Sequence, residues 1–170
     1  MLSKALAKGD SITEYASYFN RRIKSKKARA FKADWLNSVD TICSFKTPDL
    51  HSINSYKAFV DYYITHYSKL DTAIRKLYVA WLNDEKTLRP FQEYYTNICK
   101  DILQKWFSME NEYIPSQKGI IEKALKDGGK TAVIVCDGLR LEIADCVVNG
   151  LNTNEIKIDK IHPYAFVSFY

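Results

Sequence analysis

An unbroken apolar stripe between Ile53 and Trp81 constrains the fold of this chain more than any other feature. Its side chains follow one another in alternating three- and four-residue steps, the spacing of one face of an α-helix. They are Ile53, Tyr56, Val60, Tyr63, Tyr67, Leu70, Ile74, Leu77 and Trp81. A stripe of this length predicts a long helix that packs along a narrow seam.

A second apolar stripe with the same spacing follows a short turn near Asn83-Asp84. It comprises Leu88, Phe91, Tyr95, Ile98, Ile102 and Trp106. Pro90 falls early enough in this second helix to be tolerated. Two long amphipathic helices with a short connection pack antiparallel. We therefore predict that residues 1–115 form a helical bundle.

The pattern changes after Pro115, where helical and strand-like segments alternate. A helix that ends at Gly128-Gly129 precedes a run of apolar, mostly β-branched residues, which is typical of a buried parallel strand. The segments expected from there on are a strand Thr131–Cys136, a helix Arg140–Leu151, and strands Glu155–Ile161 and Tyr164–Tyr170. This order is the opening of an α/β domain.

The predicted fold is therefore α+β: a mainly α-helical region over residues 1–115, followed by the beginning of an α/β parallel-sheet domain over 116–170. Two or three strands and two helices cannot cover both faces of a buried parallel sheet. We therefore expect that the chain is a fragment in which this second domain is truncated. The alternative is that the α/β segment is a complete small domain that packs on the helices of the same chain.

Cysteine usage and hydropathy restrict the class of protein. The four cysteines include no CxxC pair and have no histidine at ligand spacing, which argues against a zinc knuckle or ribbon. No signal peptide and no apolar run of membrane-spanning length is present in the sequence. Free thiols without an export signal favour a reducing compartment, so we expect a cytoplasmic protein without a membrane partner.

The formal net charge of +5 is concentrated in one segment that contains no acidic residue. Its cations are Arg21, Arg22, Lys24, Lys26, Lys27, Arg29 and Lys32. Such a stripe can bind the phosphate backbone of a nucleic acid, or a partner protein. A solvated basic helix face is the alternative interpretation, because no known nucleic-acid motif accompanies the segment.

Asp137 follows the predicted strand and is the candidate for chemistry. A carboxylate at the carboxyl edge of a sheet lies where ligands bind and can hold a divalent cation. Gly138 has no Cβ, so the backbone or a metal could come close to this point, and the guanidinium of Arg140 could hold a phosphate. A helix N-cap for Asp137, and an ion pair for Arg140 with a nearby acid such as Glu142, are the structural alternatives.

A family resemblance adds to this interpretation. The segment concerned is Val133-Ile134-Val135-Cys136-Asp137-Gly138-Leu139-Arg140-Leu141-Glu142-Ile143-Ala144. It resembles the opening motif of the PglZ domain: a hydrophobic strand, then Asp, a small residue, Leu, Arg, any residue and Glu. PglZ domains belong to the alkaline phosphatase superfamily and often act in the BREX phage-defence systems. The resemblance implies hydrolysis of phosphate mono- or diesters.

The resemblance also implies roles for individual residues. Asp137 matches a ligand of a two-metal site, usually zinc, while Arg140 and Glu142 match the characteristic pair of the family. Gly138 replaces a frequent alanine, and Leu141 stands where an aromatic residue is often found. The Ser or Thr nucleophile and the later metal ligands have no match, so we expect this fragment to be inactive. The implied partners are a phosphate ester and other defence proteins.

Overall fold

The computed structural model describes residues 2–8, 12–109, 117–126, 129–130, 132, 134, 136 and 138–151. The chain divides into two compact units, Met1–Glu110 and Asn111–Tyr170. The described elements of the first unit are helices α1 (Leu2–Lys8), α2 (Glu14–Ile23), α3 (Lys26–Ala30), α4 (Trp35–Ser44), α5 (Tyr56–Tyr62), α6 (Ser68–Ala80) and α7 (Glu85–Phe107), a short 3₁₀ turn at Leu50–Ser52, and a π-helical segment at Tyr63–Tyr67. Those of the second unit are α8 (Gln117–Lys126) and α9 (Leu141–Leu151).

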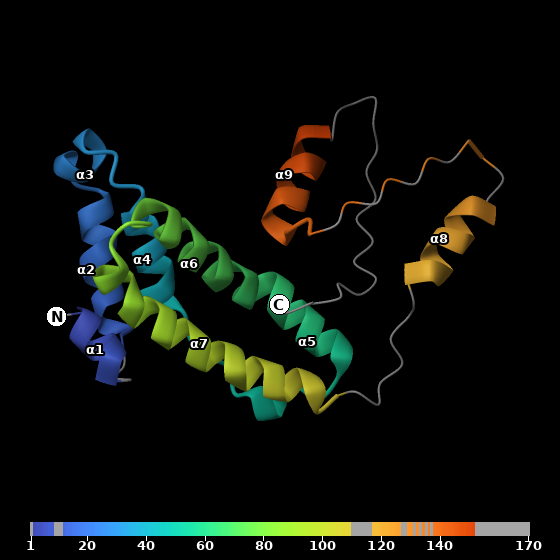
Figure 1. Ribbon diagram of the computed structural model, residues 1–170, viewed down its shortest axis with the longest axis horizontal. Helices are drawn as coiled ribbons and strands as arrows, with labels where there is room; N and C mark the ends of the chain where they lie inside the picture. The colour runs from blue at the N-terminus through green and yellow to red at the C-terminus, as the bar shows by residue number, and fades with distance from the viewer. Residues whose placement is uncertain are drawn as a thin grey trace. The chain divides into compact units, whose positions relative to one another are not determined.

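The first unit is built on the hairpin of α6 and α7, whose helices meet at the turn after Ala80 (Figure 1). The sequence predicted these two long helices and the turn between them. On this frame α4 packs against α6, α2 packs against α4, and α1 packs against α7. The first apolar stripe lies in the core of this unit, since Leu70, Ile74 and Leu77 are all at most 1% exposed.

The helix of the first stripe contains a π-helical segment that the sequence did not predict. Two hydroxyl groups, one within the segment and one directly after it, bond to carbonyl oxygens four residues earlier: Thr65 Oγ1 to Asp61 at 2.6 Å and Ser68 Oγ to Ile64 at 2.9 Å. Such bonds compete with the regular helical ladder, and π-helical turns occur mostly as short segments inside α-helices, as here. Within the segment Tyr63 is half-buried, whereas Tyr67 is buried.

The predicted α+β fold is wrong for the described part of the chain, which is all α-helical and contains no strand. Within the predicted strand Thr131–Cys136, the described residues Ala132, Ile134 and Cys136 have no regular structure, and Ile134 is 84% exposed. A parallel strand needs neighbours that accept its hydrogen bonds and cover both of its faces. The segments predicted to supply them, residues 155–161 and 164–170, lie outside the described residues.

The helical predictions for the second unit agree with the structure. The segment before Gly128-Gly129 forms α8, and the segment predicted over Arg140–Leu151 forms α9. Among the described helices of both units, none is long and apolar enough to cross a membrane.

Candidate functional site

The seven cations of the basic segment follow one another along one short stretch of the first unit, from the end of α2 through α3. Arg21 and Arg22 occupy the last turn of α2, and the others follow through α3 to the turn before α4. All seven side chains are exposed. We call this set, Arg21, Arg22, Lys24, Lys26, Lys27, Arg29 and Lys32, the basic surface.

Local hydrogen bonds fix the backbone that carries the basic surface. Ser25 caps α3, because its side-chain oxygen accepts a bond from the Ala28 amide at 3.1 Å. The guanidinium of Arg29 donates to the Lys24 carbonyl at 3.1 Å and ties α3 to the end of α2. At that end, Lys32 adopts a left-handed conformation with φ of 46°. A bond of 3.0 Å from the Ala33 amide to the Ala28 carbonyl completes a Schellman motif.

The basic surface carries little compensating negative charge. No residue between Glu14 and Asp34 is acidic. In the part of the chain that the structure describes, the ion pairs are Arg75–Asp71 and Arg89–Glu93, and neither involves the basic surface. Asp40 is near enough to Lys24 to feel its charge: burial raises the pKa of the Asp40 carboxyl, and the positive charge of Lys24 opposes that shift. The net field over this surface is therefore positive.

Two aromatic rings flank the basic surface. Tyr18 lies one turn before Arg22, whose guanidinium carbon is 5.0 Å from the centre of the tyrosine ring, a cation–π contact. Phe31 is the last residue before the left-handed turn and is 81% exposed. The cations of this surface were predicted from the sequence but Phe31 was not, although its place in a run of cations was a usable signal.

The residues of the PglZ-like motif surround the start of α9. Gly138 is left-handed with φ of 67°, and Arg140 is exposed. The Arg140 carbonyl accepts bonds from the Ile143 and Ala144 amides at 3.0 and 2.9 Å, which start the helix. Glu142 lies half-buried in its first turn. Gly138, Arg140 and Glu142 are therefore close together, whereas Asp137 lies outside the described residues.

No metal site is formed by the residues that the structure describes. Among them, no group of three or more His, Cys, Asp or Glu side chains could hold an ion. Arg140 and Gly138 offer no side-chain ligand, and Glu142 alone cannot hold a two-metal centre. The described residues therefore do not fit the metals that the resemblance implies.

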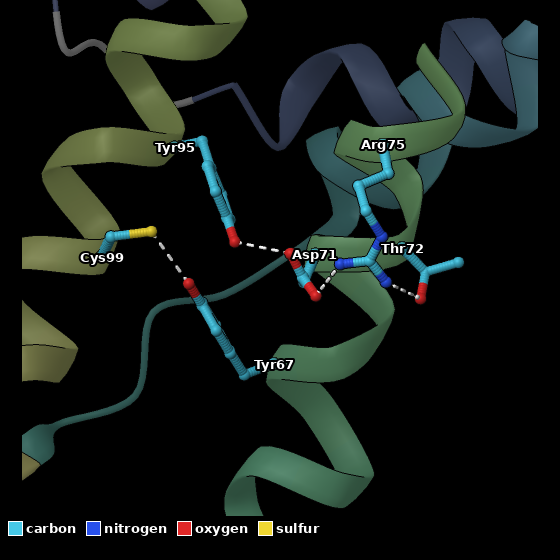
Figure 2. Close-up of polar contacts among 6 residues, drawn as sticks. All are labelled: Tyr67, Asp71, Thr72, Arg75, Tyr95 and Cys99. Atoms are coloured by element: carbon cyan, nitrogen blue, oxygen red, sulfur yellow. Dashed lines mark hydrogen bonds and ion pairs between the residues drawn. The ribbon is translucent and has the colours of Figure 1, made fainter. Parts of the chain in front are cut away.

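A polar network between the two long helices was not predicted (Figure 2). The Tyr95 hydroxyl on α7 donates to Asp71 Oδ1 on α6 at 2.6 Å, and Arg75 pairs with the other Asp71 oxygen. One turn before Asp71, at the end of the π segment, the Tyr67 hydroxyl lies 2.9 Å from the Cys99 thiol, which is one turn after Tyr95 on α7. The rings of Tyr67 and Tyr95 stack with centroids separated by 6.1 Å. This network joins α6 to α7 and is structural.

Burial and hydrogen bonding keep these tyrosine hydroxyls protonated. Desolvation raises the pKa of Tyr95 most, and its bond to the Asp71 carboxylate raises it further. Burial likewise raises the pKa of Tyr67, with a further contribution from its bond to Cys99. Only the Asp71–Arg75 spacing of four residues was visible in the sequence as a signal for this network.

Comparison of the chain with protein families, with curated proteins and with solved structures finds no match. The described part of the chain is helical, and its candidate functional regions are the basic surface and the loop before α9.

Proposed function

We propose that this chain carries the first motif of a metal-dependent phosphohydrolase of the PglZ type, which acts on phosphate mono- or diesters. The observation that carries the proposal is the loop before α9, where a left-handed Gly138 is followed by the exposed Arg140 and by the helix start. Gly138, Leu139, Arg140 and Glu142 match the small residue, leucine, arginine and glutamate of the family motif. In keeping with the resemblance, we place the activity in phage defence in the cytoplasm.

The space beside Gly138 is open. A Cβ atom placed on Gly138 would meet no atom within 4 Å beyond the glycine itself and its two chain neighbours. Arg140 is exposed next to it, and a guanidinium can bind two phosphate oxygens at once. We propose that Arg140 binds the phosphate of the ester and that Glu142 supports the loop.

The role of Asp137 as a metal ligand depends on the sequence motif alone. The expectation that a strand holds this carboxylate at a sheet edge is wrong for the described residues, and these residues form no metal site. The proposal therefore makes no use of a sheet. We assign no reaction step to the metal, and zinc remains the ion that the resemblance implies.

The test uses the product of the complete gene, purified with its metals and compared with an Asp137→Asn variant. We expect bound zinc, hydrolysis of a nitrophenyl phosphate mono- or diester, and loss of metal together with at least about a hundredfold loss of activity in the variant. Asp145→Asn on α9 makes the same chemical change outside the motif and should keep both properties.

Arg140→Gln provides a second measurement on the same protein. If Arg140 binds the phosphate, this variant should bind zinc normally but should lose kcat/KM by about a hundredfold. A gene product without metal and without hydrolysis of either ester would contradict the proposal, as would activity that survives Asp137→Asn.

A further inference from the structure

We propose that the basic surface binds single-stranded nucleic acid, with Phe31 as a stacking platform for one base. This proposal concerns α2, α3 and the turn after them, and is independent of the loop before α9. It follows from three observations, which are the gathering of exposed cations, the exposed ring among them, and the backbone conformation that presents this ring.

The charges match a phosphate backbone. The seven exposed side chains lie on consecutive turns of one short stretch of chain and make no ion pair with a carboxylate in the described ranges. A flexible polyanion can follow such a surface and release its counterions to the solvent. Arg22 is held over Tyr18, and Arg29 is held by the Lys24 carbonyl, so two of these cations are already positioned.

The position of Phe31 distinguishes one kind of nucleic acid from another. The ring is 81% exposed and stands between Arg29 and Lys32 in the sequence, so a base can reach it while its phosphates contact the neighbouring cations. Bases in a duplex are stacked on each other and cannot offer a face to a side chain, whereas unpaired bases can. The surface therefore fits a single strand better than a duplex.

The turn that presents Phe31 is conformationally costly. Lys32 is the one non-glycine residue with positive φ in the described part of the chain, and glycine would adopt this conformation without strain. The lysine at this position keeps a charge beside Phe31 at a cost in stability. This is expected if the charge contributes to binding.

The binding test uses the 170-residue chain and a labelled oligothymidine of about 20 nucleotides, followed by fluorescence anisotropy as salt is raised. If four or five cations contact phosphates, the logarithm of the affinity should fall with the logarithm of salt with a slope of about −3. Affinity for the single strand should exceed the affinity for a duplex of equal length.

Two variants separate the stacking contribution from the charge contribution. Phe31→Ala should weaken binding to the single strand by at least about fivefold and leave the salt slope unchanged. Its control is Phe107→Ala, which removes another exposed ring, 58% accessible, at the C-terminal end of α7, distant from α3 in the same unit (Figure 1). Because both rings are exposed, neither change should impair folding.

The charge variant is Lys26→Gln/Lys27→Gln/Arg29→Gln, which should weaken binding by about tenfold or more and reduce the salt slope by about 2. Its control replaces three exposed lysines of the same unit outside the basic surface by glutamine, with the same loss of net charge. These control lysines are Lys57, Lys69 and Lys100.

Several results would overturn the proposal. One is the absence of binding to the single strand at low salt. A second is equal binding to the duplex with no effect of Phe31→Ala, which would indicate a surface that reads phosphate only. A third is stronger binding to vesicles of anionic phospholipid than to oligothymidine. Equal losses from the charge variant and its control would show that net charge alone determines the binding.

Discussion

The bond between Tyr95 and Asp71 offers a direct measure of how the two long helices are held together. Tyr95→Phe keeps the ring and removes the hydroxyl that donates to Asp71 Oδ1 at 2.6 Å. Hydrogen bonds to charged groups contribute about 1.5–3 kcal/mol to stability. Asp71 keeps its pair with Arg75, and its side chain is 19% exposed, so water can partly replace the hydroxyl. We therefore expect a loss of about 1.5–2 kcal/mol.

Tyr67→Phe is the matched control, since it removes the same group from the neighbouring ring. The Tyr67 hydroxyl is partnered by the Cys99 thiol at 2.9 Å, and a thiol is a weak donor and a weak acceptor. This variant should therefore cost less than about 1 kcal/mol. Urea unfolding followed by far-UV circular dichroism measures both losses. With a slope of about 1–3 kcal/mol per M, Tyr95→Phe should lower the midpoint by about 0.5–2 M.

The reasoning would be refuted if Tyr67→Phe cost as much as Tyr95→Phe, or if Tyr95→Phe cost less than about 0.5 kcal/mol. A double-mutant cycle with Asp71→Asn checks the assignment, because the loss caused by Tyr95→Phe should shrink once the acceptor is neutral.

Three further predictions concern the first unit. Leu77→Ala should destabilise it by about 3 kcal/mol in the same urea assay, since the side chain is fully buried, whereas Val79→Ala, at an 81% exposed position, should change it by less than about 0.5 kcal/mol. Burial, with a smaller contribution from Asp40, raises the pKa of the Cys43 thiol to about 12, so a thiol reagent should modify Cys43 only as fast as the protein unfolds, after the exposed thiols have reacted. Burial also raises the pKa of tyrosine hydroxyls, that of Tyr62 to about 12, whereas unfolded tyrosines ionise near 10.0. The free energy of unfolding should therefore be constant below about pH 10 and should fall as the pH rises from there through the pKa values of the folded protein. Urea midpoints measured together with tyrosinate absorbance test this last prediction, and a midpoint that stays constant between about pH 9 and 12 would contradict it.

The helical hairpin was predictable because its signal is local. The three- and four-residue spacing of Leu70, Ile74 and Leu77 places these side chains on one face of a helix, whatever the rest of the chain does. The π segment was not predictable, since the apolar spacing does not show local changes in backbone hydrogen bonding; the bonds from the Thr65 and Ser68 hydroxyls to backbone carbonyls accompany it. The Tyr95–Asp71 bond likewise joins residues 24 positions apart, and an apolar pattern cannot show such a contact.

The strand prediction failed for a different physical reason. An apolar β-branched run such as Thr131–Cys136 indicates that the side chains prefer burial. A strand also needs neighbouring strands that form hydrogen bonds with its amides and carbonyls. Residue spacing cannot show whether those partners are in place. The loop after it was more predictable, because Gly138 tolerates the left-handed turn and the apolar periodicity of α9 begins immediately afterwards.

Lys32→Gly joins the stability argument to the binding argument at a single residue. The change should relieve about 1–2 kcal/mol of left-handed strain and cost about 0.5–1 kcal/mol of chain entropy, so the variant should be about 0.5–1 kcal/mol more stable. It also removes one cation, so the salt slope for oligothymidine should shrink by about 0.7. Lys32→Gln keeps the strain and loses the charge, so it should show the same change in slope without the gain in stability. A variant that gains stability and binds the single strand as well as the parent would show that the lysine at this turn has no part in binding. Since Phe31 precedes this turn, a loss of binding in Lys32→Gly that exceeds the loss in Lys32→Gln would instead show that the turn itself presents the ring.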